Sequence, residues 1–262
     1  MINQSLKNAF AIQKRVIGAL VLREVITRYG RHNIGFLWLF IEPMLFTVGV
    51  TILWTLSGAH QHTGLSISAF ALTGYSSVLL WRNIPGRCSS IIEANRALMF
   101  HSNVRLIDLF LSRILLEAAG VTGSFLSLSF IFIYIGWSHC PENILEVILG
   151  WGLLLLFSTG LGIFIGAIAA QSELAMIIWH PLSYLLFPLT GAAFMIDWVP
   201  TSAQKWILLM PMAHGTEIIR EGYFGSVVHA HYDVLYMLTC NFCLLLLGLL
   251  QIKKISKTMV LQ

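Results

Sequence analysis

The sequence predicts an all-α integral membrane protein with six transmembrane helices, an N-terminal amphipathic interfacial helix and short re-entrant helices before the last span. Of the 262 residues, 57% are hydrophobic and 11% are charged, whereas a soluble domain carries about 25% charged residues. The mean hydropathy is +0.79. The apolar residues fall in separate runs, and the basic residues gather between particular runs. This composition excludes a cytosolic enzyme, a nucleic-acid-binding protein and a disordered chain.

The first 30 residues are expected to form a helix that lies in the membrane interface. Its apolar residues fall near one helical face, with the basic residues largely off that face: Leu6, Phe10, Ile17, Leu20 and Val21. Such a helix buries its apolar face at the edge of the acyl chains and holds its basic side among anionic headgroups. A solvated helix would leave that apolar stripe unexplained.

Six apolar runs are predicted to cross the membrane, which takes roughly 20 residues each. They are 34–57, 67–84, 109–136, 144–170, 174–196 and 232–252. The second run is short and polar in its middle. The run 203–212 is too short to cross, and it is flanked by Pro200 and Pro211. We expect a re-entrant or interfacial helix there, paired with a second short helix at 214–222.

The basic residues predict the orientation. Fourteen of the 16 Lys and Arg residues precede the first span, lie around the connection of spans two and three, or follow the sixth span. The loops 58–66 and 137–143 contain none, and 197–231 contains only Lys205 and Arg220. Because cytoplasmic loops carry the excess of positive charge, both termini are predicted to be cytoplasmic.

Two carboxylates fall inside predicted spans, where each needs a polar lining or a partner. Glu117 stands four residues after Arg113, a spacing that lets the two side chains pair on one helix. Glu42 precedes Pro43 about two turns into its span. It is interpreted as an interfacial anchor, a proton site or part of a polar conduit.

Prolines and glycines inside the spans predict a packed bundle. Each proline removes an amide donor, so neighbouring helices must satisfy the freed carbonyls. Small residues four apart let helix backbones approach closely, and the fourth span carries such a stripe: Gly160, Gly162, Gly166 and Ala170.

No catalytic, metal or nucleotide motif is found. The pairs His60–His62 and His229–His231 lack a further ligand at zinc spacing, and Cys240 and Cys243 lie in an apolar run. No Gly-x-x-x-x-Gly-Lys-[Ser/Thr] loop is present. We therefore expect no metal and no cofactor on this chain.

Three segments carry a family resemblance. They are 28–43 (RYGRHNIGFLWLFIEP) at the start of the first span, 92–104 (IEANRALMFHSNV) after the second, and 214–224 (HGTEIIREGYF) before the sixth. They resemble ABC-2 type permeases, especially those that export capsular polysaccharide in Gram-negative bacteria. The likeness covers nearly the whole chain, as one domain. It divides into a cytoplasmic interfacial helix (1–33), a six-span bundle (34–252) and a cytoplasmic tail (253–262).

The resemblance implies the membrane subunit of an exporter in the bacterial inner membrane. A second copy of the chain would complete the conduit, and two copies of a separate cytoplasmic ABC ATPase would use ATP and Mg. Periplasmic and outer-membrane export components would receive the polysaccharide, beyond short periplasmic helices at 200–222. The residues expected to meet the ATPase are Arg23, Arg28, Arg31, Glu93, Arg96, Met99 and Phe100.

A glycan path is expected to combine aromatic rings, on which sugars stack, with charged groups. The candidates are Glu42, Tyr75, Arg82, Arg87, Tyr134, Trp179 and Tyr184. Capsular polymers are often acidic, so a basic mouth formed by Arg82, Arg87, Arg96 and Arg105 would attract them. The positive-inside rule accounts for the same arginines without a substrate.

Three alternatives remain open at this point. An exporter of O-antigen or teichoic acid would have a similar permease. A proton-coupled secondary transporter would use Glu42, Glu117 and His180, although such transporters often show inverted repeats, which this sequence lacks. A membrane-embedded glycosyltransferase or lipid enzyme would need a catalytic carboxylate or metal cluster.

Overall fold

The computed structural model describes residues 2–30, 33–58, 64–96, 98 and 104–260, and in this part of the chain every regular element is a helix. The chain order is α1 (Ile2–Tyr29), α2 (Asn33–Ser57), α3 (Ile67–Cys88), α4 (Ile91–Ala94), α6 (Leu106–Ile135), α7 (Ile144–Ala169), α8 (Glu173–Leu186), η2 (Phe187–Thr190), η3 (Ile196–Trp198), α9 (Thr201–Ile207), α10 (Pro211–Phe224), η4 (Gly225–Val227) and α11 (Val234–Val260). The all-helical prediction is confirmed for these residues.

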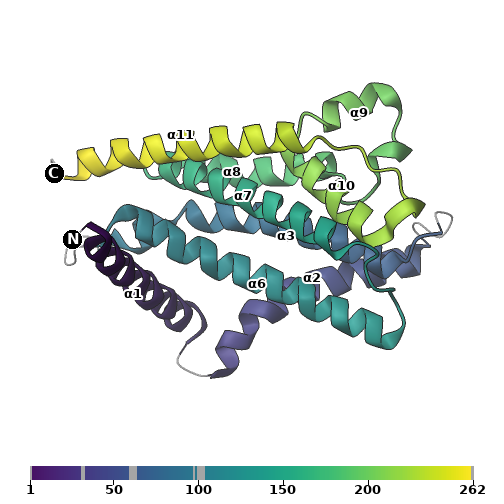
Figure 1. Ribbon diagram of the computed structural model, residues 1–262, viewed down its shortest axis with the longest axis horizontal. Coiled ribbons are helices and arrows are strands. Elements are labelled where there is room, and N and C mark those ends of the chain that lie inside the picture. Colours follow the sequence, from purple (N-terminus) through teal and green to yellow (C-terminus); the bar gives the residue numbers. More distant parts are fainter. Residues whose placement is uncertain (1, 31–32, 59–63, 97, 99–103, 261–262) are drawn as a thin grey trace.

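Four helices within the described residues are long and apolar enough to cross a membrane. They are Phe36–Ser57, Leu106–Ile135, Ile144–Ala169 and Val234–Ser256. These four agree with the predicted first, third, fourth and sixth spans. The helices lie side by side, and α1 runs obliquely to them (Figure 1).

The predicted second span is a helix whose polar residues face inward. α3 continues to Cys88, four residues beyond the predicted end, and packs against α7, α6 and α2. Thr73 and Ser77 are fully buried, and their hydroxyls donate to the carbonyls of Ala69 (2.9 Å) and Thr73 (2.6 Å). Protein therefore surrounds most of this helix, which explains how it holds polar residues.

The predicted fifth span ends earlier than expected. We predicted helix to residue 196, but α8 ends at Leu186 and η2 ends at Thr190. Pro188 lacks the amide donor that would continue the helix. Gly191 then takes a left-handed conformation with φ of 69°, which glycine adopts without strain, and turns the chain toward η3.

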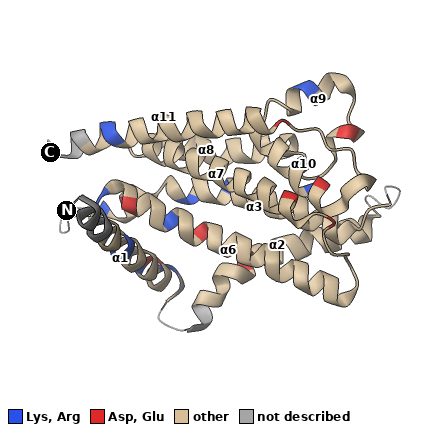
Figure 2. Cartoon of the chain, in the orientation of Figure 1, with Lys and Arg blue, Asp and Glu red and all other residues tan. Residues whose placement is uncertain are grey.

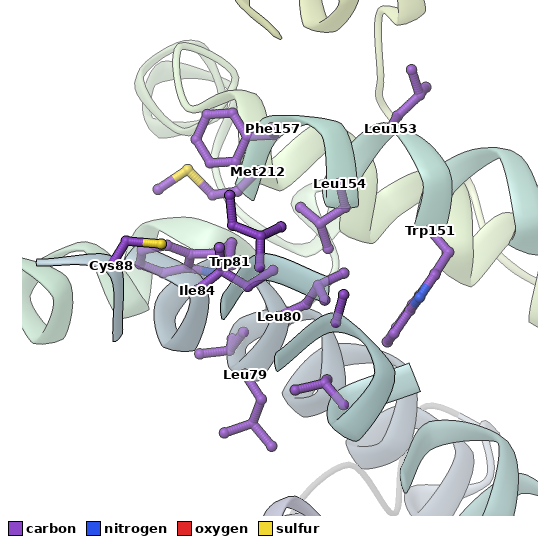
Figure 3. Packing of buried hydrophobic residues seen from close by; sticks show 14 of the residues in the cluster. Leu79, Leu80, Trp81, Ile84, Cys88, Trp151, Leu153, Leu154, Phe157 and Met212 are labelled. Atoms are coloured by element: carbon purple, nitrogen blue, oxygen red, sulfur yellow. The ribbon is translucent and has the colours of Figure 1, made fainter. Parts of the chain in front are cut away.

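The core lies where α3, α7 and α10 meet. Trp81 and Ile84 of α3 gather with Leu154 and Phe157 of α7, and Met212 of α10 lies beside them (Figure 3). These five side chains are at most 4% exposed. The packing of these apolar side chains thus stabilises the contact of α10 with the central helices α3 and α7.

The small-residue stripe of α7 packs as predicted. A Cβ placed on Gly160 would lie 3.1 Å from Leu244 Cβ of α11, and one on Gly166 would lie 2.7 Å from the carbonyl oxygen of Cys88 in α3. A side chain at Gly166 would therefore collide with backbone. The glycines allow α3 and α11 to approach α7 closely.

Both chain ends lie at the same end of the bundle, and α9 and α10 lie at the opposite end (Figure 1). Lys and Arg gather around the end that carries the termini and along α1, while few lie near α9 and α10 (Figure 2). The predicted short helices at 203–212 and 214–222 are present as α9 and α10. Their boundary differs from the prediction because Pro211 begins α10, a position that suits proline.

The helix α1 packs on α6 through a mixed face. Leu20 is buried in the core, but Phe10, which we placed on the same apolar stripe, is 75% exposed. Gln13 donates to Asp108 of α6 at 2.8 Å. Polar residues therefore share the packed face with Leu20, and Phe10 lies on the exposed side of α1.

Candidate functional site

A network of ion pairs joins α1, α2, α3 and α6 near the end that carries the termini. Arg28 of α1 donates to the Glu117 carboxylate of α6. Arg87 of α3 lies between two carboxylates, with Nη2 3.5 Å from Glu42 Oε1 and Nε 3.6 Å from Glu117 Oε1. Glu117 is nearly fully buried, so these two arginines provide the partners that a carboxylate inside a span requires.

The predicted pair between Arg113 and Glu117 does not form. Arg113 Nη2 instead lies 2.6 Å from Glu24 Oε1 of α1, and Arg113 Nη1 donates to the Arg87 carbonyl at 3.0 Å. The i,i+4 spacing permitted the pair, but α1 crosses α6 and supplies a new partner to each residue. The contact between helices thus replaces the contact within one helix.

A small pocket opens beside this network. It encloses about 230 Å³ of space, its open mouth included, and it is lined by Arg28, Leu39, Glu42, Pro43, Asn83, Arg87, Glu117, Gly120 and Val121. Glu42 thus lies at a polar pocket next to the bend-forming Pro43. Both carboxylates of the proton-transport alternative bond to arginines here.

The two segments predicted to meet an ATPase lie against each other. Arg23 of α1 donates to the Asn95 side-chain carbonyl, just after α4, at 2.7 Å. Asn95 is buried and also donates to the Ile91 carbonyl at 2.8 Å. Glu93 and Arg96 are exposed on either side of it. Arg31, Met99 and Phe100 lie outside the described residues.

The aromatic candidates for a glycan path are not brought together. Trp179 is buried in the core at 3% exposure, whereas Tyr134 is 93% exposed near the end of α6. Tyr75 is half-buried and packs edge-on against Phe187. Tyr184 is 63% exposed, and the Arg82 guanidinium carbon lies 4.9 Å from the centre of its ring.

A buried charged cluster on α10 was missed by the sequence analysis. Arg220 is fully buried and donates to the carbonyls of Gly191, Ala192 and Phe194 in the segment after η2. The Phe70 ring lies 3.8 Å from its guanidinium carbon. Arg220 therefore fastens α10 to that segment and to α3.

Glu217 holds the same region by accepting hydrogen bonds. Its Oε1 accepts from the Ile196 amide at 3.3 Å, and its Oε2 accepts from the His231 amide at 3.1 Å. The signal in the sequence was the spacing of Glu217 and Arg220, which puts two charges on one face of a short helix. From the sequence, Arg220 is expected to be an outer basic residue, and both residues belong to the segment 214–224, without a structural role for either.

His214 occupies the same helix and joins its two flanking segments. Its Nε2 lies 2.8 Å from the Leu208 carbonyl oxygen, and its Nδ1 accepts from the Asp233 amide at 2.8 Å. The neutral ring, with its proton on Nε2, satisfies both bonds. Burial lowers the pKa of His214 below its usual value, since desolvation disfavours the charged ring.

Among the residues that the structure describes, no three His, Cys, Asp or Glu side chains are grouped so as to hold a metal ion. His231 Nε2, in the segment before α11, lies 3.1 Å from Asp197 Oδ1 of η3. The other predicted pair, His60–His62, lies outside the described residues.

Comparison with known proteins identifies one matching family and several similar proteins. A family model described as ABC-2 type transporter matches residues 15–224. The chain is 43% identical over 253 residues to the capsule polysaccharide export inner-membrane protein CtrC of Neisseria meningitidis serogroup A, covering 97% of this chain and 96% of that protein. It is 41% identical over 251 residues to the capsule polysaccharide export inner-membrane protein BexB of Haemophilus influenzae, covering 96% and 95%. It is 28% identical over 250 residues to the polysialic acid transport protein KpsM of Escherichia coli, covering 90% and 93%.

Proposed function

The chain belongs to the ABC-2 type transporter family, and from this we propose that it is the membrane subunit of an ATP-driven exporter of capsular polysaccharide. The observation that carries the proposal is near full-length similarity to CtrC and BexB, both named as capsule polysaccharide export inner-membrane proteins. ATP hydrolysis belongs to a separate ABC ATPase subunit, which uses ATP and Mg. The exported glycan is too polar to cross hydrocarbon and needs a lined conduit.

We propose six spans, with α3 and the unit α8–η2 added to the four apolar helices. The 22 residues of α3 extend about 33 Å. The 14 residues of α8 and four of η2 extend about 29 Å. Both lengths match a hydrocarbon core of about 30 Å. The clustering of basic residues at the end that carries the termini supports a cytoplasmic location for both termini.

The proposed transporter contains two copies of this chain and two ATPase subunits, with the conduit between the copies. Periplasmic and outer-membrane components would receive the polymer beyond α9 and α10. The path residues proposed from the sequence remain Glu42, Tyr75, Arg82, Arg87, Tyr134, Trp179 and Tyr184.

The proposed coupling surface consists of α1 and the connection that contains α4. The hydrogen bond between Arg23 and Asn95 supports this, because a displacement of either segment would move the other. Arg28 and Arg87 continue the connection into α2, α3 and α6 through Glu42 and Glu117. ATP binding by the partner would shift the populations of closed and open conduits through these contacts.

Two measurements test the proposed function. A tagged chain purified from its own membrane should bring with it a P-loop ATPase. Cells lacking the chain should retain their polysaccharide inside and display none at the surface, and the restored gene should reverse this. Normal surface polysaccharide without the chain would contradict the proposal.

A further inference from the structure

Arg82 differs from the other arginines of the predicted basic mouth. It is half-buried six residues before the end of α3, about 9 Å along the helix. Arg87 is held by Glu42 and Glu117, and Arg96 and Arg105 are exposed in the connection beyond α3. No carboxylate among the described residues forms an ion pair with Arg82.

The contact that Arg82 does make leaves its hydrogen-bond donors free. Its guanidinium carbon lies 4.9 Å from the centre of the Tyr184 ring, which is a cation–π contact. The N–H donors point outward in the plane of the guanidinium, in the fork that matches a carboxylate or phosphate. The Tyr184 ring therefore contacts the cation without accepting a hydrogen bond from its donors.

Two further polar side chains of α8 are exposed near Arg82. Tyr184 is 63% exposed, and His180, also exposed, lies one turn earlier on the same face of α8. Ionisable side chains within spans face the bundle interior or a water-filled cavity. The other large exposed side chains of α8, such as Ile178 and Leu182, are apolar, so His180 and Tyr184 are the polar exceptions beside Arg82.

We propose that Arg82 and Tyr184 form a binding station for the anionic group of the exported glycan, either a carboxylate or a phosphodiester. This deepens the proposed export function and rests on it. Arg82 binds the anion with two N–H donors, and the exposed part of the Tyr184 ring packs against the adjoining sugar. An acidic polymer carries the same anionic group in every repeat. As the chain moves, Arg82 can therefore release one group and bind the next. A neutral glycan lacks the group that Arg82 selects.

Binding by the purified chain in lipid nanodiscs tests the station directly. The probes are oligosialic acid, a hexosamine oligomer joined by phosphodiesters, and a neutral glucan oligomer of equal length, titrated calorimetrically at fixed ionic strength. Arg82→Gln should weaken binding of the preferred anionic oligomer at least tenfold, and Arg82→Lys several-fold. Tyr184→Leu should weaken it several-fold, while Tyr184→Phe, which keeps the ring, should stay within twofold. Which anionic oligomer binds more tightly identifies the group recognised.

The matched control is Lys253→Gln, which removes an exposed positive charge from α11 and should leave binding unchanged. The station is overturned if Arg82→Gln binds within twofold of the unmodified chain, if Lys253→Gln causes the same loss, or if the unmodified chain prefers the neutral oligomer or binds none. Arg82→Lys and Tyr184→Leu, which retain the charge, carry the test if Arg82→Gln fails to fold. Surface polymer in cells separates the two proposals. If export requires the chain but is unchanged by Arg82→Gln, the proposed export function stands and the proposed binding station is wrong.

Discussion

At the scale of single residues, Arg220 has the most demanding surroundings. It satisfies three carbonyls of the segment after η2 and stacks on Phe70. Arg220→Ala should lower the stability of the purified protein, because each unsatisfied buried group costs about 1–3 kcal/mol. Arg220→Lys should recover little, since an ammonium group has neither the planar fork nor the stacking face. Thermal unfolding in detergent measures the loss, and Lys205→Ala on exposed α9 is the control. An unchanged melting temperature for Arg220→Ala would contradict the structural role.

His214 makes the stability of the α10 region depend on pH. Its folded-state pKa is lowered by burial, so its unfolded form binds a proton more readily. The stabilisation is fully present above the unfolded pKa of about 6.5 and is lost as the pH falls through the lower folded pKa. The melting temperature should therefore drop between pH 7.5 and pH 5. The drop should be smaller in His214→Gln and unchanged in His139→Gln, which alters an exposed histidine. Equal drops in all three proteins would rule out His214 as the cause.

Glu42 separates an ATP-driven exporter from a proton-coupled carrier. Its pair with Arg87 is 3.5 Å long and more than a third exposed, so the charge itself contributes at most about 1 kcal/mol. Glu42→Gln keeps the shape and a hydrogen bond, and export should persist. Glu42→Ala leaves Arg87 with one partner fewer, and export should decrease. The measurement is surface polymer at equal permease levels. Complete loss in Glu42→Gln, with transport that follows the proton gradient at constant ATP, would support the carrier.

The residues that sequence reasoning found and missed differ in where their partners come from. Glu42 and Glu117 were recognisable because a carboxylate within a span needs compensation wherever it lies. Their partners were not, because Arg28 and Arg87 come from other helices. The buried contacts of Glu217 and Arg220 were not predicted, because a short segment outside the spans is expected to be exposed to water. In the structure α10 packs against α7 and α3.

At the scale of elements, the length of each apolar run predicted the four long apolar helices, which are only partly buried by protein. It did not predict where a helix is interrupted. The stripe Gly160–Gly166 indicated close packing because small residues four apart permit it in any partner arrangement. The end of α8 was not predictable from apolar content, since the residues after Thr190 remain apolar. The carbonyls of that segment are satisfied by Arg220 in place of a continued helix.

The docking of α1 on α6 should depend on the pair of Glu24 and Arg113. The two side chains are 2.6 Å apart and less than a fifth exposed, a setting in which contacting residues couple by about 0.5–3 kcal/mol. Glu24→Gln and Arg113→Gln should each speed hydrogen exchange in α1. The free-energy change in the double variant should be smaller than the sum of the two single changes. Lys14→Gln, on an exposed position of α1, should leave exchange unchanged. Additive effects of the two substitutions would show that the pair is not coupled.

At the scale of the whole molecule, composition alone established an integral membrane protein, because no soluble surface could be made from 11% charged residues. The six-helix proposal is harder to reach by hydropathy, since α3 is polar inside and α8 is short. Both depend on neighbours for their burial, and a window along the sequence does not contain those neighbours. The faces that would meet a second copy are likewise absent from any pattern within one chain.

The orientation of the whole bundle predicts which cysteines an impermeant reagent reaches. Basic residues gather at the end that carries the termini (Figure 2), so that end should be cytoplasmic and the connection between α6 and α7 should face outward. Cys140 is exposed in that connection. In cells with a permeabilised outer membrane, an impermeant maleimide should label the unmodified chain, and Cys140→Ser should abolish most of that labelling. In the Cys140→Ser background, Ser226→Cys should restore labelling from outside, whereas Lys253→Cys should react only after the inner membrane is opened. Labelling at position 253 but not at 226 in closed cells would invert the topology, and with it the assignment of α1 to the ATPase side.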